Sequence, residues 1–194
     1  MKKVVYIIPG GGESHKRQKG YNKIAKMFEE KGITPIHVEI EWEDRKKSQN
    51  FSNYFDQFLK VFKKEKGTQI YILGFSFGAM IAYLTASKTK PKAFILCSLS
   101  PYFEEDMEKT IKVSWVKRWR KAFVDSYSFA KFVSKVKSET YLLVGDKEDK
   151  SVLIRSKEAK KKIKYSRLTI IKGVKHNIGQ KEYQEAIKKL INKL

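Results

Sequence analysis

The sequence has little cysteine and no long apolar run. Cys97 is the only cysteine among 194 residues, which excludes an internal disulfide. No apolar stretch approaches the roughly 20 residues of a membrane-spanning helix. The N-terminal run "VVYII" ends at Pro9, and no small-residue cleavage site follows it. We therefore expect a cytoplasmic protein with neither a signal peptide nor a transmembrane segment.

Acidic residues are also scarce, since 21 Asp and Glu face 42 Lys and Arg, a formal net charge of +21. A small soluble domain is well served by a net charge of about 2–8, and a more basic surface attracts polyanions and anionic membranes. However, lysine dominates arginine, whereas fork-like phosphate recognition favours arginine. We interpret the charge as a lysine bias typical of AT-rich genomes, and we expect no specific nucleic acid partner.

Apolar, β-branched runs alternate with amphipathic segments along the chain. The length suits one domain, residues 1–194. Strands are expected within 3–12, 33–42, 68–76, 92–100, 138–146 and 166–176, and helices within 18–32, 50–67, 77–88, 152–164 and 180–194. This regular alternation predicts an α/β fold, a three-layer α/β/α sandwich around a mostly parallel six-stranded sheet.

Residues 101–138 interrupt this alternation. They show no evident strand and carry several aromatic side chains among many charges: Tyr102, Phe103, Trp115, Trp119, Phe123, Tyr127, Phe129 and Phe132. A parallel α/β unit needs only one crossover helix at this point. We therefore interpret the segment as an insertion into the single domain.

The apolar run "IYILGFSFGAMIAYL" at 70–84 is broken by two glycines and a serine. Gly74, Ser76 and Gly78 fit G-x-S-x-G, the nucleophile elbow. Glycines at this spacing let the following helix pass close to the strand, while its N-terminal amides face developing negative charge. Ligands of parallel α/β sheets bind at the carboxyl ends of the strands, so Ser76 is the predicted nucleophile.

A serine hydroxyl needs a base to take its proton, and the chain has three histidines. His37 is out of phase with the apolar positions of its strand, which predicts a surface position. His15 follows the first glycine loop. His176 follows the last strand on the correct side of the sheet, and chain order and topology select it as the base.

The histidine needs an acid that orients it, and "VGDKED" after the fifth strand supplies Asp146, Glu148 and Asp149. The residues themselves leave this choice open.

An oxyanion hole needs preorganised amides. The predicted donors are the N–H of Phe77 and that of Gly11 in "PGGGES", with Gly12 as its neighbour. That loop fits neither G-x-G-x-x-G nor a P-loop, so we predict no cofactor, and we predict no metal site either.

Four segments together, "IIPGGGES", "GFSFG", "VGDKED" and "GVKHNI", resemble the α/β-hydrolase superfamily, specifically its small bacterial single-domain members. They cover the chain from about residue 4 to its end, in the family order of serine, acid and histidine. The resemblance implies a sheet without the two leading antiparallel strands of larger members. It also implies that residues 101–138 form a helical lid.

The chain departs from the family at two places. The oxyanion loop has Pro9-Gly10 where the family often has His-Gly. The family acid usually stands three residues after the glycine that ends the strand, and here that residue is Glu148 rather than aspartate. Asp149 has the usual residue type but stands one position late. By spacing we favour Glu148, then Asp149.

From these residues we expect a serine hydrolase that cleaves a small carboxylic ester or thioester through an acyl-enzyme. The aromatic residues of the lid favour an apolar acyl or aryl pocket, and the basic residues of 117–121 favour an anionic substrate. One alternative is a hydrolase-like scaffold whose basic surface binds nucleic acid or an anionic membrane. Others are an acyltransferase, or halogen or C–C bond chemistry, on the same fold.

Overall fold

The computed structural model describes residues 1–11, 15–43, 48–110 and 123–194. Within them, six strands form one sheet in the order β2-β1-β3-β4-β5-β6, and every neighbouring pair is parallel. The strands are β1 Lys3–Ile8, β2 Thr34–His37, β3 Gln69–Phe75, β4 Ala93–Cys97, β5 Glu139–Gly145 and β6 Ser166–Ile171. The predicted six-stranded parallel sheet is confirmed.

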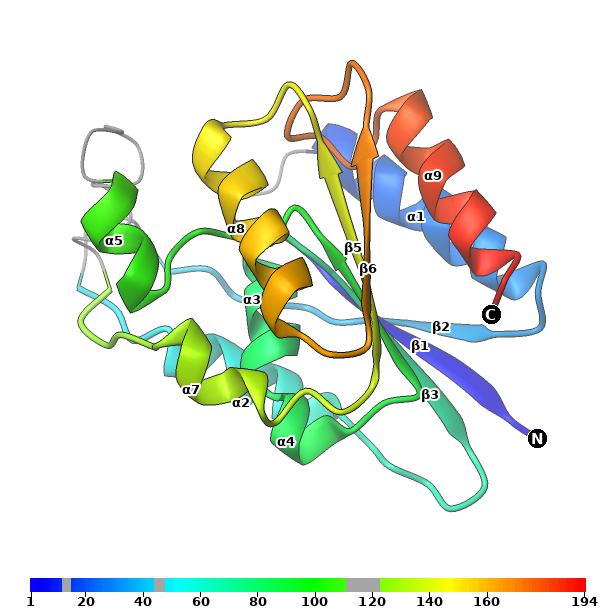
Figure 1. The fold of residues 1–194 in the computed structure, drawn as a ribbon. Helices are drawn as coiled ribbons and strands as arrows, with labels where there is room; N and C mark the ends of the chain where they lie inside the picture. The colour runs from blue at the N-terminus through cyan, green and yellow to red at the C-terminus, as the bar shows by residue number, and fades with distance from the viewer. Residues whose placement is uncertain (12–14, 44–47, 111–122) are drawn as a thin grey trace.

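Helices cover both faces of the sheet (Figure 1). They are α1 His15–Glu29, α2 Ser52–Val61, α3 Phe77–Leu84, α4 Ala86–Thr89, α5 Glu104–Thr110, α7 Phe129–Val133, α8 Lys150–Lys162 and α9 Lys181–Ile191. Successive side chains of β1 point to opposite faces. Tyr6 joins a core with α2, α3 and α8, whereas Val5 and Ile7 join a core with α1 and α9. The fold is therefore the expected three-layer sandwich.

Several predicted elements are shorter than the sequence indicates, among them the second strand and the second helix. The strand expected over 33–42 ends at His37, although Val38 and Ile40 still pack on the core. β2 lies at the edge of the sheet and pairs with β1. Val38 N donates to Ile7 O, and beyond that point β1 gives way to the glycine loop. The ladder ends because its partner ends.

The helix expected to reach Gly67 ends at Val61, because Phe62 is extended with φ −70° and ψ 120°. The Tyr6 hydroxyl accepts a hydrogen bond from Lys63 N at 2.9 Å and lies 3.2 Å from Lys63 O. The Phe62 ring packs 5.1 Å from the Tyr6 ring. This tertiary contact overrides the local helical pattern.

Residues 101–138 hold α5 and α7, and Trp115 and Trp119 lie outside the described residues. The described part is fastened to the sandwich by a buried ion pair between Arg155 of α8 and Asp106 of α5. The Arg155 guanidinium also lies 4.4 Å from the centre of the Phe129 ring, and Phe129 stacks on Tyr83 of α3. The segment therefore packs against the helices that follow β3 and β5.

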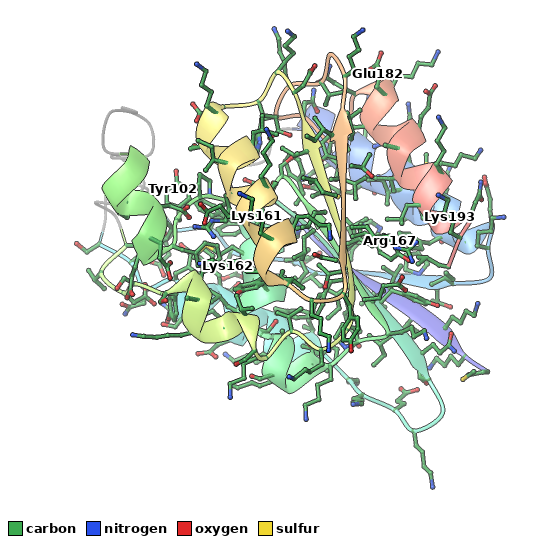
Figure 2. The ribbon with its side chains drawn as sticks, in the orientation of Figure 1. Tyr102, Lys161, Lys162, Arg167, Glu182 and Lys193 are labelled. Atoms are coloured by element: carbon green, nitrogen blue, oxygen red, sulfur yellow. The ribbon has the colours of Figure 1, made fainter. Side chains whose placement is uncertain are left out.

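Lysine and arginine side chains project outward from α8, from β6 and from the chain end after α9. Figure 2 labels Lys161 and Lys162 on α8, Arg167 on β6 and Lys193 near the C-terminus. Among the described residues, every helix is too short or too polar to span a bilayer.

Candidate active site

The turn between β3 and α3 holds Ser76 in an unusual backbone conformation, with φ 55° and ψ −117°. A positive φ is uncommon for a residue with a Cβ and costs about 1–3 kcal/mol. A Cβ added at Gly74 would lie 2.3 Å from Gly78 O, and one added at Gly78 would lie 2.2 Å from Ile8 O. Both glycines of the motif are therefore required by close backbone approach around the serine.

His176 lies in the loop between β6 and α9, and its Nε2 is 3.0 Å from Ser76 Oγ. The loop packs directly on the end of β5, because a Cβ added at Gly145 would lie 2.2 Å from Val174 O. The imidazole ring also packs 4.8 Å from the Phe75 ring. Residues a hundred positions apart in the chain thus share one hydrogen bond at the carboxyl edge of the sheet.

Glu148 is the carboxylate that bonds to His176. Its Oε2 lies 2.6 Å from His176 Nδ1, and its side chain is fully buried whereas that of His176 is 34% exposed. The other carboxylate oxygen, Oε1, accepts hydrogen bonds from Gly145 N and from Ser98 Oγ, both at 2.7 Å. Every contact of this buried carboxylate is therefore with a donor, as a charged carboxylate requires.

The two other candidate acids have different contacts. Asp149 is the N-cap of α8, and its Oδ1 accepts hydrogen bonds from Ser151 N at 2.8 Å and Ser151 Oγ at 2.6 Å. Asp146 Oδ1 accepts a hydrogen bond from Gly173 N. One acid thus meets the histidine, one caps a helix and one supports the turn after β6. As predicted, His37 is exposed.

The predicted oxyanion loop lies against the elbow. A Cβ added at Gly11 would lie 2.4 Å from Cδ2 of Phe77, so the loop backbone and the Phe77 ring are in contact. Phe77 is the first residue of α3, directly after Ser76. Gly10 N donates to the Tyr21 hydroxyl at 3.0 Å, which fastens the loop to α1. Gly12 lies outside the described residues.

An aromatic cluster surrounds the Phe77 side chain. Its members come from the loop after β2, the start of α2, the loop after β4 and the later part of residues 101–138. They are Trp42, Phe51, Tyr102 and Phe123 respectively. A cavity of about 480 Å³ shares Trp42 with this cluster and is also lined by Pro9, Tyr21, His37 and Glu39. This volume lies within the usual range of small-molecule pockets.

Sequence reasoning missed two serines after β4. Ser98 Oγ contacts Glu148, and Ser100 Oγ lies 3.2 Å from Ser76 Oγ. The available signal was the polar pattern of "CSLS" at the carboxyl end of the strand beside β3. Cys97, the last residue of β4, is buried, and burial raises the pKa of its thiol. The thiol therefore keeps its proton and is not a competing nucleophile.

The described residues contain no group of three or more His, Cys, Asp or Glu side chains that could hold a metal ion. The groups gathered at the site are instead a hydroxyl, an imidazole and a carboxylate, hydrogen-bonded in series at the carboxyl edge of the sheet. This arrangement can move a proton away from Ser76.

A hydrolase family model described as serine aminopeptidase S33 matches residues 1–192. A search of curated proteins gave no match.

Many solved structures share the fold. Est1E from Butyrivibrio proteoclasticus with ferulic acid bound is 16% identical with a TM-score of 0.77, covering 98% of this chain and 87% of that one. A bromoperoxidase from Bacillus anthracis is 15% identical with a TM-score of 0.72, covering 100% and 93%. The thioesterase domain from the curacin biosynthetic pathway is 14% identical with a TM-score of 0.71, covering 100% and 92%. At these identities the likeness concerns the fold alone.

Proposed function

The chain belongs to the serine aminopeptidase S33 family of α/β-hydrolases, and from this premise we propose that it cleaves a small carboxylic ester or thioester with Ser76 as nucleophile. The observation that carries the proposal is the hydrogen-bonded series from Ser76 Oγ through His176 to Glu148. A bonded nucleophile, base and orienting acid are the elements that covalent acyl transfer needs.

In the proposed first half-reaction, Ser76 Oγ attacks the acyl carbon while its proton passes to His176 Nε2, 3.0 Å away. Glu148, which accepts the Nδ1 proton, keeps the correct tautomer and stabilises the imidazolium. The imidazolium then protonates the leaving alcohol or thiol, and an ester on Ser76 remains. In the second half, His176 takes a proton from water, the hydroxide attacks the ester, and Ser76 regains its proton as the acid leaves.

Negative charge on the tetrahedral oxygen needs donors near Ser76. We assign this role to the N–H groups of Phe77 and Gly11. Phe77 begins α3, so its amide lies at the positive end of that helix. The contact between Gly11 and the Phe77 ring supports the assignment, because it places the loop against the residue that follows Ser76. Donors of this kind contribute about 10²–10³ to kcat.

For the substrate we propose an apolar or aromatic acyl group. The aromatic cluster around Phe77, which meets the cavity at Trp42, favours such a group over a charged one. The similarity to an esterase that binds ferulic acid points in the same direction. We further propose that residues 101–138 act as a lid, since their described part packs on α3 and α8, which follow the strands that carry Ser76 and Glu148.

The test is turnover of p-nitrophenyl esters of graded chain length by the wild type and Ser76→Ala. We expect the wild type to show a maximum at one chain length and Ser76→Ala to lose activity by about 10³-fold or more, as for removal of a nucleophile. Equal turnover by the two folded proteins would refute the mechanism. A Trp42→Ala variant with an unchanged chain-length profile would remove the cavity from the proposal.

A further inference from the structure

The residue that follows β4 is held in a conformation that its own side chain does not favour. Ser98 has φ 50° and is fully buried, although such a backbone favours glycine. Its N–H donates to Leu143 O of β5 at 2.7 Å, which fixes the turn. Strained non-glycine residues persist where the surroundings hold them, and they cluster at functional sites. The question is what the serine side chain does there.

The Ser98 hydroxyl lies between two buried oxygen atoms. It is 2.7 Å from Glu148 Oε1 and 2.9 Å from the Tyr183 hydroxyl of α9, which itself lies 3.0 Å from Leu143 O. A carboxylate can only accept a hydrogen bond, so the Ser98 hydroxyl donates its hydrogen bond to Glu148. The Tyr183 hydroxyl then donates its hydrogen bond to Ser98 Oγ or to Leu143 O. Burial, with the neighbouring Cys97 and Glu148, raises the pKa of Tyr183, so the phenol keeps that proton.

These contacts divide the two oxygens of Glu148 between two tasks. Oε1 is anchored by Gly145 N and by Ser98 Oγ, from the ends of β5 and β4. Oε2 is left to face His176 Nδ1 at 2.6 Å. Two donors on Oε1 restrain the carboxylate more tightly than Gly145 N alone would. The buried charge also gains a second charge-assisted hydrogen bond.

We propose that Ser98 is a positioning residue that fixes the Glu148 carboxylate for His176, with Tyr183 supporting it from α9. The proposal rests on the proposed function, because it acts through the Ser76–His176 pair. Under this proposal, α9 helps to position the active site, because its Tyr183 contacts Ser98. The hydrogen-bonded series then runs from Tyr183 through Ser98, Glu148 and His176 to Ser76, with distances between 2.6 and 3.0 Å.

The experiment compares Ser98→Ala and Ser98→Gly with the wild type in ester turnover. Both remove the hydroxyl, and we expect kcat to fall about 10- to 100-fold with KM little changed, the effect of losing one hydrogen bond to a charged group. Glycine suits φ 50°, so Ser98→Gly should unfold at a higher temperature than Ser98→Ala. A similar loss of kcat in the two variants, although their stabilities differ, separates positioning from folding.

A second readout and two further variants complete the design. The downfield ¹H NMR signal of the His176 Nδ1 proton should shift or broaden in both Ser98 variants. Tyr183→Phe keeps the hydrogen bond from Ser98 to Glu148, so it should lower kcat less than the Ser98 variants do. Ser156→Ala is the matched control, because Ser156 is buried on α8 and its Oγ has no hydrogen-bond partner among the described residues.

Ser98→Gly with wild-type kcat and an unshifted Nδ1 signal would overturn the positioning role. If Ser76→Ala is inactive while both Ser98 variants are normal, this role fails and the proposed function stands. If Ser76→Ala is as active as the wild type, the proposed function itself fails.

Discussion

At the scale of single residues, the backbone around Ser76 leaves no room for side chains. Gly78 lies with its Cα beside the carbonyl of Ile8, and Gly74 lies beside Gly78. Glycine is therefore needed at these two positions because a Cβ would meet neighbouring backbone atoms. A left-handed conformation is not the reason, since neither has the positive φ seen at Gly32, Gly67 and Gly173. The strained residue of this turn is the serine itself.

Gly78→Ala should lower the free energy of unfolding by about 1–3 kcal/mol or more, because the new Cβ would meet backbone oxygen that cannot move without shifting β1. Gly173→Ala is the comparison, since it has open space around it but φ 76°. That variant should lose only the cost of conformational strain, about 1 kcal/mol. Urea unfolding of both variants measures the difference. Equal losses would show that close approach at Gly78 has no energetic weight.

The sequence could locate Ser76 and His176 because each follows a strand, and the carboxyl ends of parallel strands share one edge. It could not choose among Asp146, Glu148 and Asp149. All three lie within four positions of one turn, and the geometry of that turn decides which carboxylate reaches the histidine. Spacing ranked Glu148 first, and the structure brings its carboxylate to His176. Its catalytic role stays a prediction. Ser98 belongs to no motif, so its contact with Glu148 could not be predicted from the sequence.

At the scale of elements, contacts distant in sequence decide where elements end and how the insertion is held. The Tyr6 hydroxyl ends α2 at its contact with Lys63, and no local pattern reports this. In the insertion, Glu105 of α5 accepts hydrogen bonds from Ser128 Oγ at 2.6 Å, Phe129 N at 2.8 Å and Ala130 N at 3.0 Å. One carboxylate therefore joins α5 to the first turn of α7.

This junction should respond to pH. Burial acts to raise the pKa of Glu105, but the hydrogen bonds from Ser128, Ala130 and Phe129 outweigh it and lower the pKa from 4.5 to about 2. A carboxyl with a depressed folded-state pKa stabilises the fold above its unfolded-state value, and that stability is lost as pH falls towards the folded-state value. The junction should therefore be fully formed above pH 4.5 and weaken between pH 4.5 and about 2.

Glu105→Gln should be less stable than the wild type at neutral pH, and the difference should shrink as pH falls below 4.5. Urea unfolding of both proteins across this pH range measures it. Glu104→Gln is the matched control: Glu104 is exposed and accepts a hydrogen bond from Ser126 Oγ. A Glu105→Gln difference that is constant with pH would contradict the assignment.

At the scale of the whole molecule, the parallel sheet explains how one site is assembled from the length of the chain. Gly11, Ser76, Ser98, Glu148 and His176 follow β1, β3, β4, β5 and β6 respectively. Regular strand–helix alternation allowed this architecture to be predicted without coordinates. The attachment of residues 101–138 through Arg155 and Asp106 was not predictable, because a buried ion pair leaves no spacing signal.

The central claim is that Ser76 is an activated nucleophile, and active-site labelling with a fluorophosphonate probe tests it most directly. We predict one phosphonyl adduct per chain, located by peptide mass spectrometry on Ser76. It should be absent in Ser76→Ala and about 10²–10⁴-fold slower in His176→Ala, since general-base assistance contributes about that much. Ser100→Ala, which removes the neighbouring hydroxyl 3.2 Å away, should still label at Ser76. Folded protein that takes no label, or takes it on another serine, would contradict the account.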